Sequence, residues 1–129
     1  MIAGVGTDLC SVARFARMLA EDGDGIAHRI LSASELVEFA SAKRPAHFLA
    51  KRFAAKEALG KALGTGIRAP VLLRAIAVMH DDLGRPDFAF DEALAAWMAE
   101  RALRPHLSLS DENEHALAFV VVERTENRT

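Results

Sequence analysis

The chain is poor in the residues that crosslink, stack or span a membrane. Among its 129 residues is one cysteine, Cys10, which excludes an internal disulfide and a cysteine-based metal cluster within one chain. Aromatic residues make up only 6% of the sequence, so few side chains could stack on nucleic-acid bases. No apolar run approaches the roughly 18 to 20 residues that cross a bilayer, and the start lacks the basic and apolar regions of a signal peptide. We therefore expect a soluble, unexported, cytoplasmic protein.

Acidic residues are scarce in one segment, residues 43 to 68. This segment holds seven basic residues and one acid, Glu57, so it carries 7 − 1 = +6, whereas the whole chain carries −2 and the remainder therefore −8. The basic residues are Lys43, Arg44, Lys51, Arg52, Lys56, Lys61 and Arg68. Such segregation concentrates positive potential and attracts anions. The sequence therefore favours a phosphate-rich ligand over an apolar one.

Apolar patterns typical of helices and of strands, separated by turn residues, predict one domain of mixed helices and strands, residues 1–124. A flexible tail, residues 125–129, is expected to follow. The capping-box pair Ser32 and Glu35, Pro45 at a helix start and Gly64 after a helix end mark boundaries. The expected strands are Ile2–Asp8, Leu72–His80, Asp87–Phe90, His106–Ser110 and Ala116–Arg124, and the expected helices run from Ser11 to about Ala20, from Ser32 to about Ala42, from Pro45 to Leu63 and from Glu92 to about Leu103.

Glu57 allows two interpretations. It lies four residues before Lys61 on the predicted helix, and this order of acid and base is typical of a plain surface ion pair. Its isolation among cations also suits a metal ligand, whose ion would neutralise phosphates held by Arg52, Lys56 and Lys61. Mg²⁺ usually takes one or two carboxylates together with waters and phosphate oxygens. Asp8 is the obvious second carboxylate, although it could equally cap the helix that follows it.

Glycine and histidine residues carry weaker signals. The segment from Gly4 to Gly6 lacks the third glycine of a dinucleotide fingerprint, so we set that interpretation aside. The segment from Gly64 to Gly66 follows a helix, so it terminates that helix and could help to bind phosphate only through loop amides beside cations and a metal. His106 lies on the polar face of its predicted strand, where an ordinary half-exposed histidine is the simpler interpretation.

Several separated blocks, in order and at similar spacing, resemble the holo-(acyl-carrier-protein) synthase family of 4′-phosphopantetheinyl transferases. The blocks are Ile2–Asp8, Arg29–Leu31, Phe48–Ala50, Arg52–Ala58, Lys61–Gly66, Gly84–Pro86 and His106–Ser110. The resemblance covers nearly the whole chain, from Ile2 to about Arg124. It implies an α+β domain of the phosphopantetheinyl-transferase type, with a small, mostly antiparallel sheet packed with helices. It also implies a homotrimer with active sites between subunits.

The same resemblance implies a reaction and its residues. The family moves 4′-phosphopantetheine from coenzyme A to a serine of apo acyl carrier protein and releases adenosine 3′,5′-bisphosphate. Asp8 and Glu57 match the family's Mg²⁺ ligands, and His106 matches a histidine near the reacting groups. The residues matched to the coenzyme's phosphates or nucleotide are Arg44, Arg52, Lys61, Gly64, Thr65, Gly66, Gly84, Arg85 and Pro86. Arg14, Met18 and Arg29 match the carrier-docking surface, although by themselves they could be a solvated helix face. A metal-bound water or Glu57 is the expected base, with His106 a weaker candidate.

Some positions depart from the family pattern. Asp111 stands where a second histidine is more usual, and Lys51 stands where a small residue is usual. Near the first helix, Glu21, Asp22 and Asp24 replace residues that are often basic or neutral. These acids should weaken the attraction for a strongly acidic carrier. They point to an unusual native carrier, for example a domain of a larger synthase.

Two other functions fit part of the sequence. The segment from residue 43 to residue 68 could bind nucleic acid through phosphate contacts. Against this, Glu57 would repel a phosphate backbone unless a metal covered it, and the chain is acidic overall. A trimer subunit without activity would leave Asp8 as a helix cap and Glu57 as part of a surface ion pair.

Overall fold

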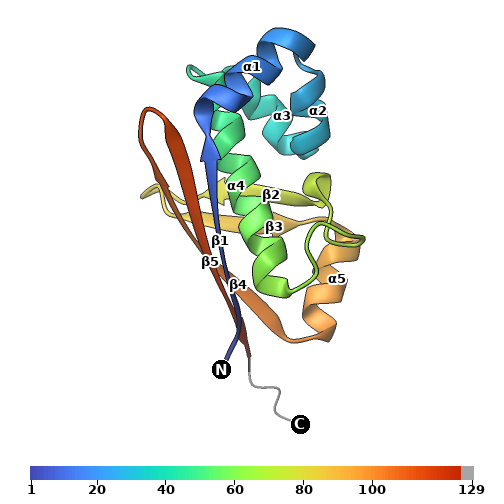
Figure 1. Cartoon of the computed structure of the whole chain (residues 1–129). Helices are drawn as coiled ribbons and strands as arrows, with labels where there is room; N and C mark the ends of the chain where they lie inside the picture. Colours follow the sequence, from blue (N-terminus) through green and yellow to red (C-terminus); the bar gives the residue numbers. More distant parts are fainter. Residues whose placement is uncertain (126–129) are drawn as a thin grey trace.

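Two antiparallel sheets and five α-helices make up the part of the chain that the computed structural model describes, residues 1–125 (Figure 1). The larger sheet has the strand order β1, β5, β4, and the smaller sheet is the hairpin of β2 and β3. The strands are β1 (Ile2–Ser11), β2 (Ile76–His80), β3 (Pro86–Phe90), β4 (Leu103–Asp111) and β5 (His115–Arg124). The helices are α1 (Val12–Asp22), α2 (Gly25–Ile30), α3 (Ala33–Phe39), α4 (Pro45–Leu63) and α5 (Glu92–Glu100), with a 3₁₀ turn, η1 (Leu73–Ala75). This arrangement confirms the predicted α+β class with antiparallel pairing.

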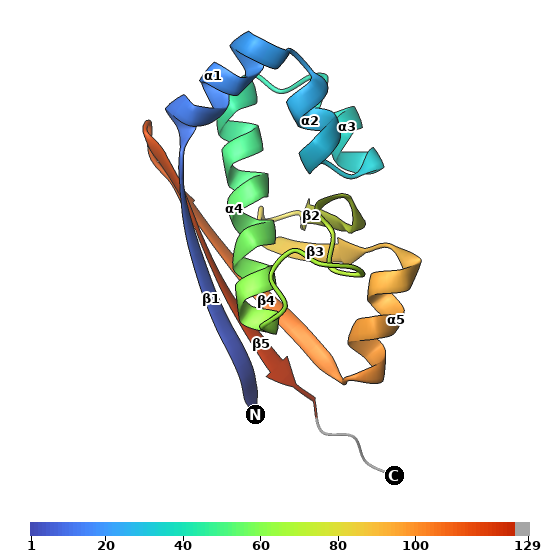
Figure 2. The same ribbon diagram turned by 45° about the vertical axis from the view of Figure 1, so that its right-hand side comes forward.

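Helix α4 is the central element. It lies between the three-stranded sheet and the β2–β3 hairpin, and α1, α2 and α3 gather at the end where it begins (Figures 1 and 2). Its buried positions are largely alanine: Ala50, Ala54, Ala55, Ala58 and Ala62. Small side chains allow close approach on several sides of a helix, whereas a surface helix buries one stripe. The helix that carries most of the basic segment is therefore a core helix.

Two glycines in β1 let the strand lie directly on α4. A Cβ atom added to Gly4 would overlap the carbonyl oxygen of Ala62, and one added to Gly6 would overlap the carbonyl oxygen of Ala58. Successive residues of a strand point to opposite faces, so Asp8 and Cys10 share the inner face with these glycines. The glycine pair that superficially suggested nucleotide binding thus serves helix–strand packing, and it brings Asp8 to the last turns of α4.

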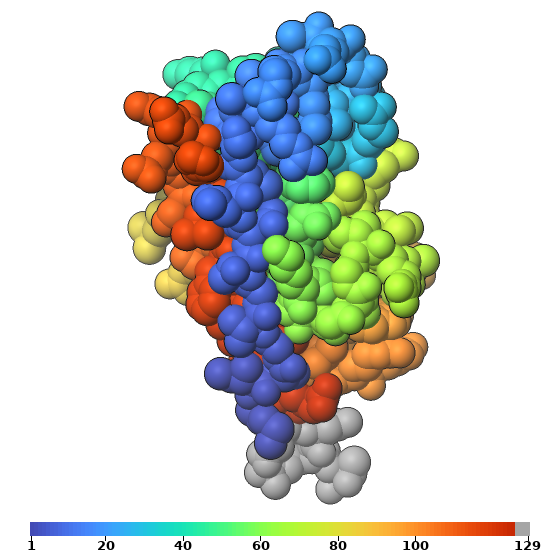
Figure 3. All heavy atoms as spheres, viewed as in Figure 1, coloured from blue at the N-terminus to red at the C-terminus, as the bar shows by residue number. Residues whose placement is uncertain are grey.

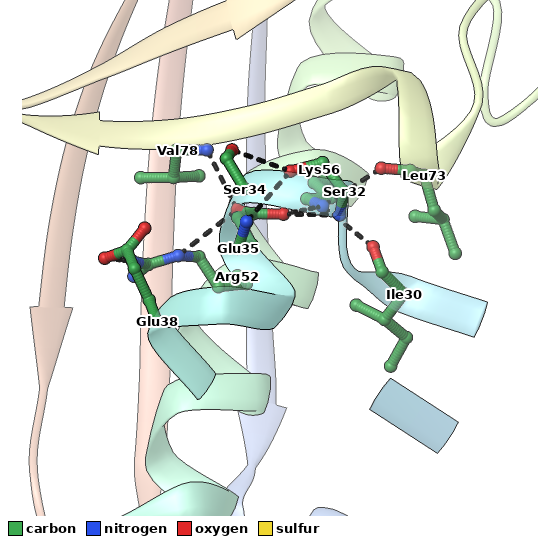
Figure 4. A network of polar contacts seen from close by, with 9 residues as sticks. All are labelled: Ile30, Ser32, Ser34, Glu35, Glu38, Arg52, Lys56, Leu73 and Val78. Atoms are coloured by element: carbon green, nitrogen blue, oxygen red, sulfur yellow. Dashed lines mark hydrogen bonds and ion pairs between the residues drawn. The ribbon is translucent and has the colours of Figure 1, made fainter. Parts of the chain in front are cut away.

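The core contains a buried polar network around Glu35 (Figure 4). Glu35 and Lys56 are both completely buried, and their side chains meet at 2.5 Å. The remaining contacts of Glu35 are the amide of Ser32 at 3.0 Å, the amide of Val78 at 2.9 Å and Nε of Arg52 at 3.2 Å. Lys56 also donates to the carbonyl oxygens of Ile30 at 2.7 Å and Leu73 at 3.0 Å. The network joins α3, α4 and β2, and it includes the predicted capping box of Ser32 and Glu35.

Most expected elements are present, with several differences. The first strand runs to Ser11 and not Asp8, and the helix expected to reach about Ala42 ends at Phe39. Helix α2 was not predicted, because its six residues follow a glycine-rich turn and are too few to show the apolar pattern of a helix. Residues 73–75, expected to be strand, form η1. The helix expected to reach Leu103 ends at Glu100, because Leu103 instead pairs with Arg124 and starts β4. The inclusion of Pro105 in β4 is tolerated at the edge of a sheet.

The predicted tail begins with Thr125, whose amide donates to the carbonyl oxygen of Ala102 at 2.8 Å. The rest of that predicted tail, residues 126–129, lies outside the described residues. Within residues 1–125, no helix has the length and apolar character required to cross a membrane.

Substitution of Gly6 by alanine should loosen the contact between β1 and α4. The added methyl group would overlap a backbone oxygen that cannot rotate away. We expect a loss of roughly 1 to 3 kcal/mol of unfolding free energy, typical of overpacking, and a melting temperature lower by several degrees. Gly25→Ala is the matched control, because its methyl group would meet only the movable carboxylate of Asp22. Equal melting temperatures for the two variants would contradict this account.

Substitution of Lys56 by methionine should destabilise the chain strongly, because it leaves the buried carboxylate of Glu35 without its closest cation. Breaking a buried ion pair from one side costs about 3 to 5 kcal/mol. Urea denaturation of Lys56→Met should therefore show a far lower midpoint than the wild type. The double variant Glu35→Gln/Lys56→Met should recover part of the loss, and a double variant less stable than Lys56→Met alone would argue against the network.

Candidate active site

Asp8 and Lys61 meet where the last turn of α4 lies on β1. The ammonium of Lys61 is 3.1 Å from Oδ1 of Asp8 and donates to the carbonyl oxygen of Thr7 at 2.9 Å. The Lys61 side chain is 55% exposed, whereas that of Asp8 is 17% exposed. The carboxylate is therefore held at the edge of the core, and the cation above it faces solvent.

Glu57 lies one turn before Lys61 on the same face of α4. Burial raises the pKa of its carboxyl, and the negative charge of nearby Asp8 raises it further, whereas Lys61 and Arg14 oppose the rise. Lys61 pairs with Asp8, and a Glu57–Lys61 pair is not among the ion pairs of the described residues. The plain surface-pair interpretation is therefore wrong. Asp8 is not the helix cap either, since Ser11 accepts the amide hydrogen of Arg14 at the start of α1.

The two carboxylates fit a hard divalent cation. The negative charge of Asp8 raises the pKa of Glu57, and a bound cation would relieve that repulsion. Within the described residues, no group of three or more His, Cys, Asp and Glu side chains is arranged to hold a metal. A pair of carboxylates suits Mg²⁺, which completes its coordination with waters and phosphate oxygens. Asp8 and Glu57 could hold such an ion only with help from its ligand.

The glycine loop after α4 lies directly beyond Lys61. Gly64 and Gly66 both have positive φ, 77° and 65°, and the amide of Gly64 donates to the carbonyl oxygen of Lys61, as expected of a helix-ending glycine. The amide of Gly66 returns to the carbonyl oxygen of Gly60 at 3.0 Å. The end of α4 and this loop lie against β1 on the face shown in Figure 3. The loop thus follows the Lys61 end of the Asp8–Glu57–Lys61 cluster.

A second group of predicted site residues lies elsewhere in the chain. Residues 85–87, around the start of β3, and residues 104–107 of β4 line a small cavity of about 170 Å³, which Pro86 and His106 therefore share. Nε2 of His106 is 2.8 Å from Oε1 of Glu123. His106 points from the outer face of the large sheet, whereas Asp8 points from its inner face. A single chain therefore does not bring His106 to Asp8 and Glu57.

Two of the predicted phosphate ligands are buried structural residues. Lys56 is completely buried, and all three of its hydrogens are used in the network around Glu35. The Arg52 side chain is 4% exposed and lies 4.2 Å above the Phe48 ring, 3.3 Å from Glu38. A helix turns about 100° per residue, so Arg52 and Lys61, nine positions apart, face opposite directions. The structure places Arg52 and Lys56 in the core and away from the Lys61 cluster.

Arg44 is remote from the cluster as well. It precedes the first residue of α4, and the rise of about 1.5 Å per residue places it about 25 Å from Lys61 along the helix. Its guanidinium is exposed and lies 2.6 Å from Nε2 of His47. Within one chain, Arg44 and Lys61 therefore do not share a phosphate.

Acids from outside the basic segment neutralise much of its charge. Lys51, Arg52, Lys56 and Lys61 form ion pairs with carboxylates that lie far away in the sequence, on Asp111, Glu35, Glu38 and Asp8. The positive potential predicted from the local count is therefore reduced in the folded chain. Two of the departures from the family pattern, Lys51 and Asp111, contact each other at 3.8 Å.

The predicted docking residues lie on the helices next to the cluster. Arg14 of α1 is exposed, approaches the rings of Phe15 and Phe53 at 5.5 and 5.6 Å, and is near enough to Glu57 to lower its pKa. Met18 is partly buried against the core. Arg29 of α2 is paired with Asp22 at 2.8 Å, so the acids near α1 neutralise part of this surface.

Sequence reasoning missed three polar partners. Glu35 was assigned only to a cap, although it is the centre of the buried network. Glu123 lies diagonal to His106 across β4 and β5, a relation that follows from strand register and not from spacing along the chain. Cys10 donates to Asp8 at 3.1 Å, and the two-residue period of a strand could have indicated this contact.

Comparison with known proteins agrees with the motifs. Residues 4–120 match the sequence model of the 4′-phosphopantetheinyl transferase superfamily. The holo-[acyl-carrier-protein] synthase of Laribacter hongkongensis is 60% identical over 124 residues, 95% of this chain and 99% of that protein. The crystal structure of holo-[acyl-carrier-protein] synthase from Neisseria meningitidis aligns with a TM-score of 0.92 at 50% identity, covering 95% of this chain and 99% of that one. The Bacillus anthracis enzyme, solved in complex with CoA (3′,5′-ADP), aligns with a TM-score of 0.82 at 36% identity, covering 97% of this chain and 99% of that one.

These matches confirm the resemblance drawn from the sequence blocks, and they span nearly the whole chain at identities well above those that indicate a shared fold alone. The chain therefore belongs to the 4′-phosphopantetheinyl transferase superfamily and, within it, to the holo-[acyl-carrier-protein] synthases.

Proposed function

We propose that the chain transfers 4′-phosphopantetheine from coenzyme A to a serine of an apo acyl carrier protein, releasing adenosine 3′,5′-bisphosphate, with Mg²⁺ held by Asp8 and Glu57. The observation that carries the proposal is the convergence of two carboxylates and a solvent-facing lysine beside a glycine loop. The complex of the Bacillus anthracis relative with CoA supports coenzyme A as the phosphate-bearing substrate. Both substrates would meet the enzyme in the cytoplasm.

The chemistry needs charge neutralisation and a proton acceptor. The serine oxygen forms a bond to the phosphorus that carries pantetheine, and the bond from that phosphorus to the oxygen of the adenosine 5′-phosphate breaks. Mg²⁺ would lower the charge of the diphosphate during this exchange. Lys61 is long and exposed enough to hold the departing phosphate, and amides of the loop from Gly64 to Gly66 can assist. Glu57 has two carboxylate oxygens, so one could hold the metal while the other accepts the serine proton.

The proposal includes a homotrimer with active sites between subunits. The outer face of the large sheet exposes several large apolar side chains: Ile2, Val5, Leu9, Leu117 and Phe119, each at least 42% exposed. Contiguous exposed apolar residues are typical of protein interfaces. His106 lies on this face, and Pro86 shares its small cavity. A second copy seated there would supply its His106 and its Gly84–Pro86 segment to the Asp8–Glu57–Lys61 cluster of the first.

The carrier would dock beside the same cluster. Arg14 is exposed and close to Glu57, which places a cation where an acidic helix could approach. Because Asp22 already holds Arg29, we assign Arg14 and Met18 the larger share of the contact. Nucleic acid is not proposed as a ligand, because long-range ion pairs neutralise much of the basic segment.

The metal site predicts a clear assay result. The purified protein, coenzyme A, Mg²⁺ and an apo carrier should give a phosphopantetheine adduct on the carrier, observed by intact mass. We expect Asp8→Asn and Glu57→Gln to lower the rate by at least about a hundredfold, as loss of transition-state charge stabilisation does, and EDTA to abolish it. Glu92→Gln, an exposed carboxylate on α5, should react like the wild type. Full-rate modification by either site variant, with unchanged circular dichroism, would remove the two-carboxylate site.

The shared active site predicts complementation between two inactive variants. Asp8→Asn and His106→Ala should each be weak alone. After mixing and subunit exchange, sites that combine a normal Asp8 with a normal His106 from a neighbour should restore about a quarter of wild-type activity, the share expected for random pairing of equal amounts. Light scattering should report three chains per particle throughout. Activity of the mixture no greater than the mean of the separate variants would exclude sites built from two subunits.

A further inference from the structure

Asp8 has a second donor besides Lys61. The Sγ atom of Cys10 donates to Oδ2 of Asp8 at 3.1 Å, while the ammonium of Lys61 lies 3.1 Å from Oδ1. Cys10 follows Asp8 by two positions on β1, so both side chains leave the same face of the strand. The two oxygens of one carboxylate are therefore held by different groups, one from the strand and one from α4.

The two donors differ in rigidity. Lys61 is an exposed side chain with four rotatable carbon–carbon bonds, and in the proposed reaction it would hold a phosphate. Cys10 is 3% exposed, has one rotatable bond to its sulfur and faces Ala116 of β5. Cys10 is therefore the donor whose position does not depend on whether a ligand is bound.

The thiol is the donor in the contact between Cys10 and Asp8. A protonated thiol has one hydrogen to give, and the carboxylate is the charged acceptor beside it. The contact thus has a fixed direction, from sulfur to oxygen.

We propose that Cys10 is a positioning residue for Asp8: its thiol fixes Oδ2 and so keeps Oδ1 turned toward the cations of the active site. This inference rests on the proposed function, because it assumes that Asp8 binds the metal. Groups that hydrogen-bond to metal ligands commonly change metal affinity by 10- to 100-fold when removed. A thiol is a weak donor, so we expect an effect near the lower limit.

Three substitutions separate positioning from packing. Cys10→Ser keeps a donor at the same place, Cys10→Val fills the same space without a donor, and Cys10→Ala removes both. Positioning predicts that metal affinity follows the presence of a donor. The wild type and Cys10→Ser should then bind Mn²⁺ alike within about twofold, and Cys10→Ala and Cys10→Val should bind it about tenfold more weakly. If Cys10 serves only packing, the variants should instead differ in stability, with Cys10→Val as stable as the wild type and Cys10→Ser destabilised by its buried hydroxyl.

The readout is binding without turnover. Mn²⁺ is titrated into the intact protein with coenzyme A but no carrier, and free Mn²⁺ is measured by electron paramagnetic resonance, with melting temperature followed in parallel. Leu94→Ala, a truncation of a fully buried residue on α5, which packs on β3 and β4, should lower the melting temperature and leave the Mn²⁺ affinity unchanged. Asp8→Asn should abolish the tight Mn²⁺ binding.

The outcomes distinguish the inference from the function on which it rests. Wild-type Mn²⁺ affinity in Cys10→Val and Cys10→Ala, with binding lost in Asp8→Asn, would overturn the role of Cys10 alone. Affinities that follow the melting temperatures across the series would also overturn it, because they would assign Cys10 to packing. Tight Mn²⁺ binding in Asp8→Asn would remove the metal site and with it both proposals.

Discussion

The close contact between β1 and α4 is the constraint on which the rest of the structure depends. Two glycines without side chains allow the strand to touch the backbone of the helix. This contact brings Asp8, near the start of the chain, within ion-pair distance of Lys61 and under the electrostatic influence of Glu57. Neither carboxylate could take part in one site if side chains separated the two elements. The packing of small residues is thus what brings Asp8 to the residues of α4.

Helix α4 serves structure on one side and chemistry on the other. Lys56 and Arg52 face the buried carboxylate of Glu35, where breaking an ion pair is costly because no water can replace the lost partner. Glu57 and Lys61 face β1 and solvent. The network around Glu35 fixes the rotation of the helix about its axis, since a helix turned by one residue would place the wrong side chains on both sides. Structural and functional cations are therefore interleaved in one short stretch of sequence.

Local signals in the sequence were sufficient for local structure. Pro45 and Gly64 fixed both ends of α4, and the predicted Ser32–Glu35 capping box is present. Counting charges along the chain failed, because the acids that neutralise the basic segment arrive from distant positions such as Glu35 and Asp8. Strand register could not be predicted from local signals either. It determines that Asp8 and His106 lie on opposite faces of the sheet and that Glu123 is the partner of His106.

The strand order has a consequence for how the chain matures. The last strand of the described residues, β5, is the middle strand of the large sheet, so β1 and β4 have no hydrogen-bonded neighbour in that sheet until β5 is in place. The pairing of β1 with β5 joins residues more than a hundred positions apart, a high contact order that slows folding. During synthesis, α4 can form while its sheet is still incomplete. The sheet surface that carries Asp8 is therefore completed only once β5 pairs with β1.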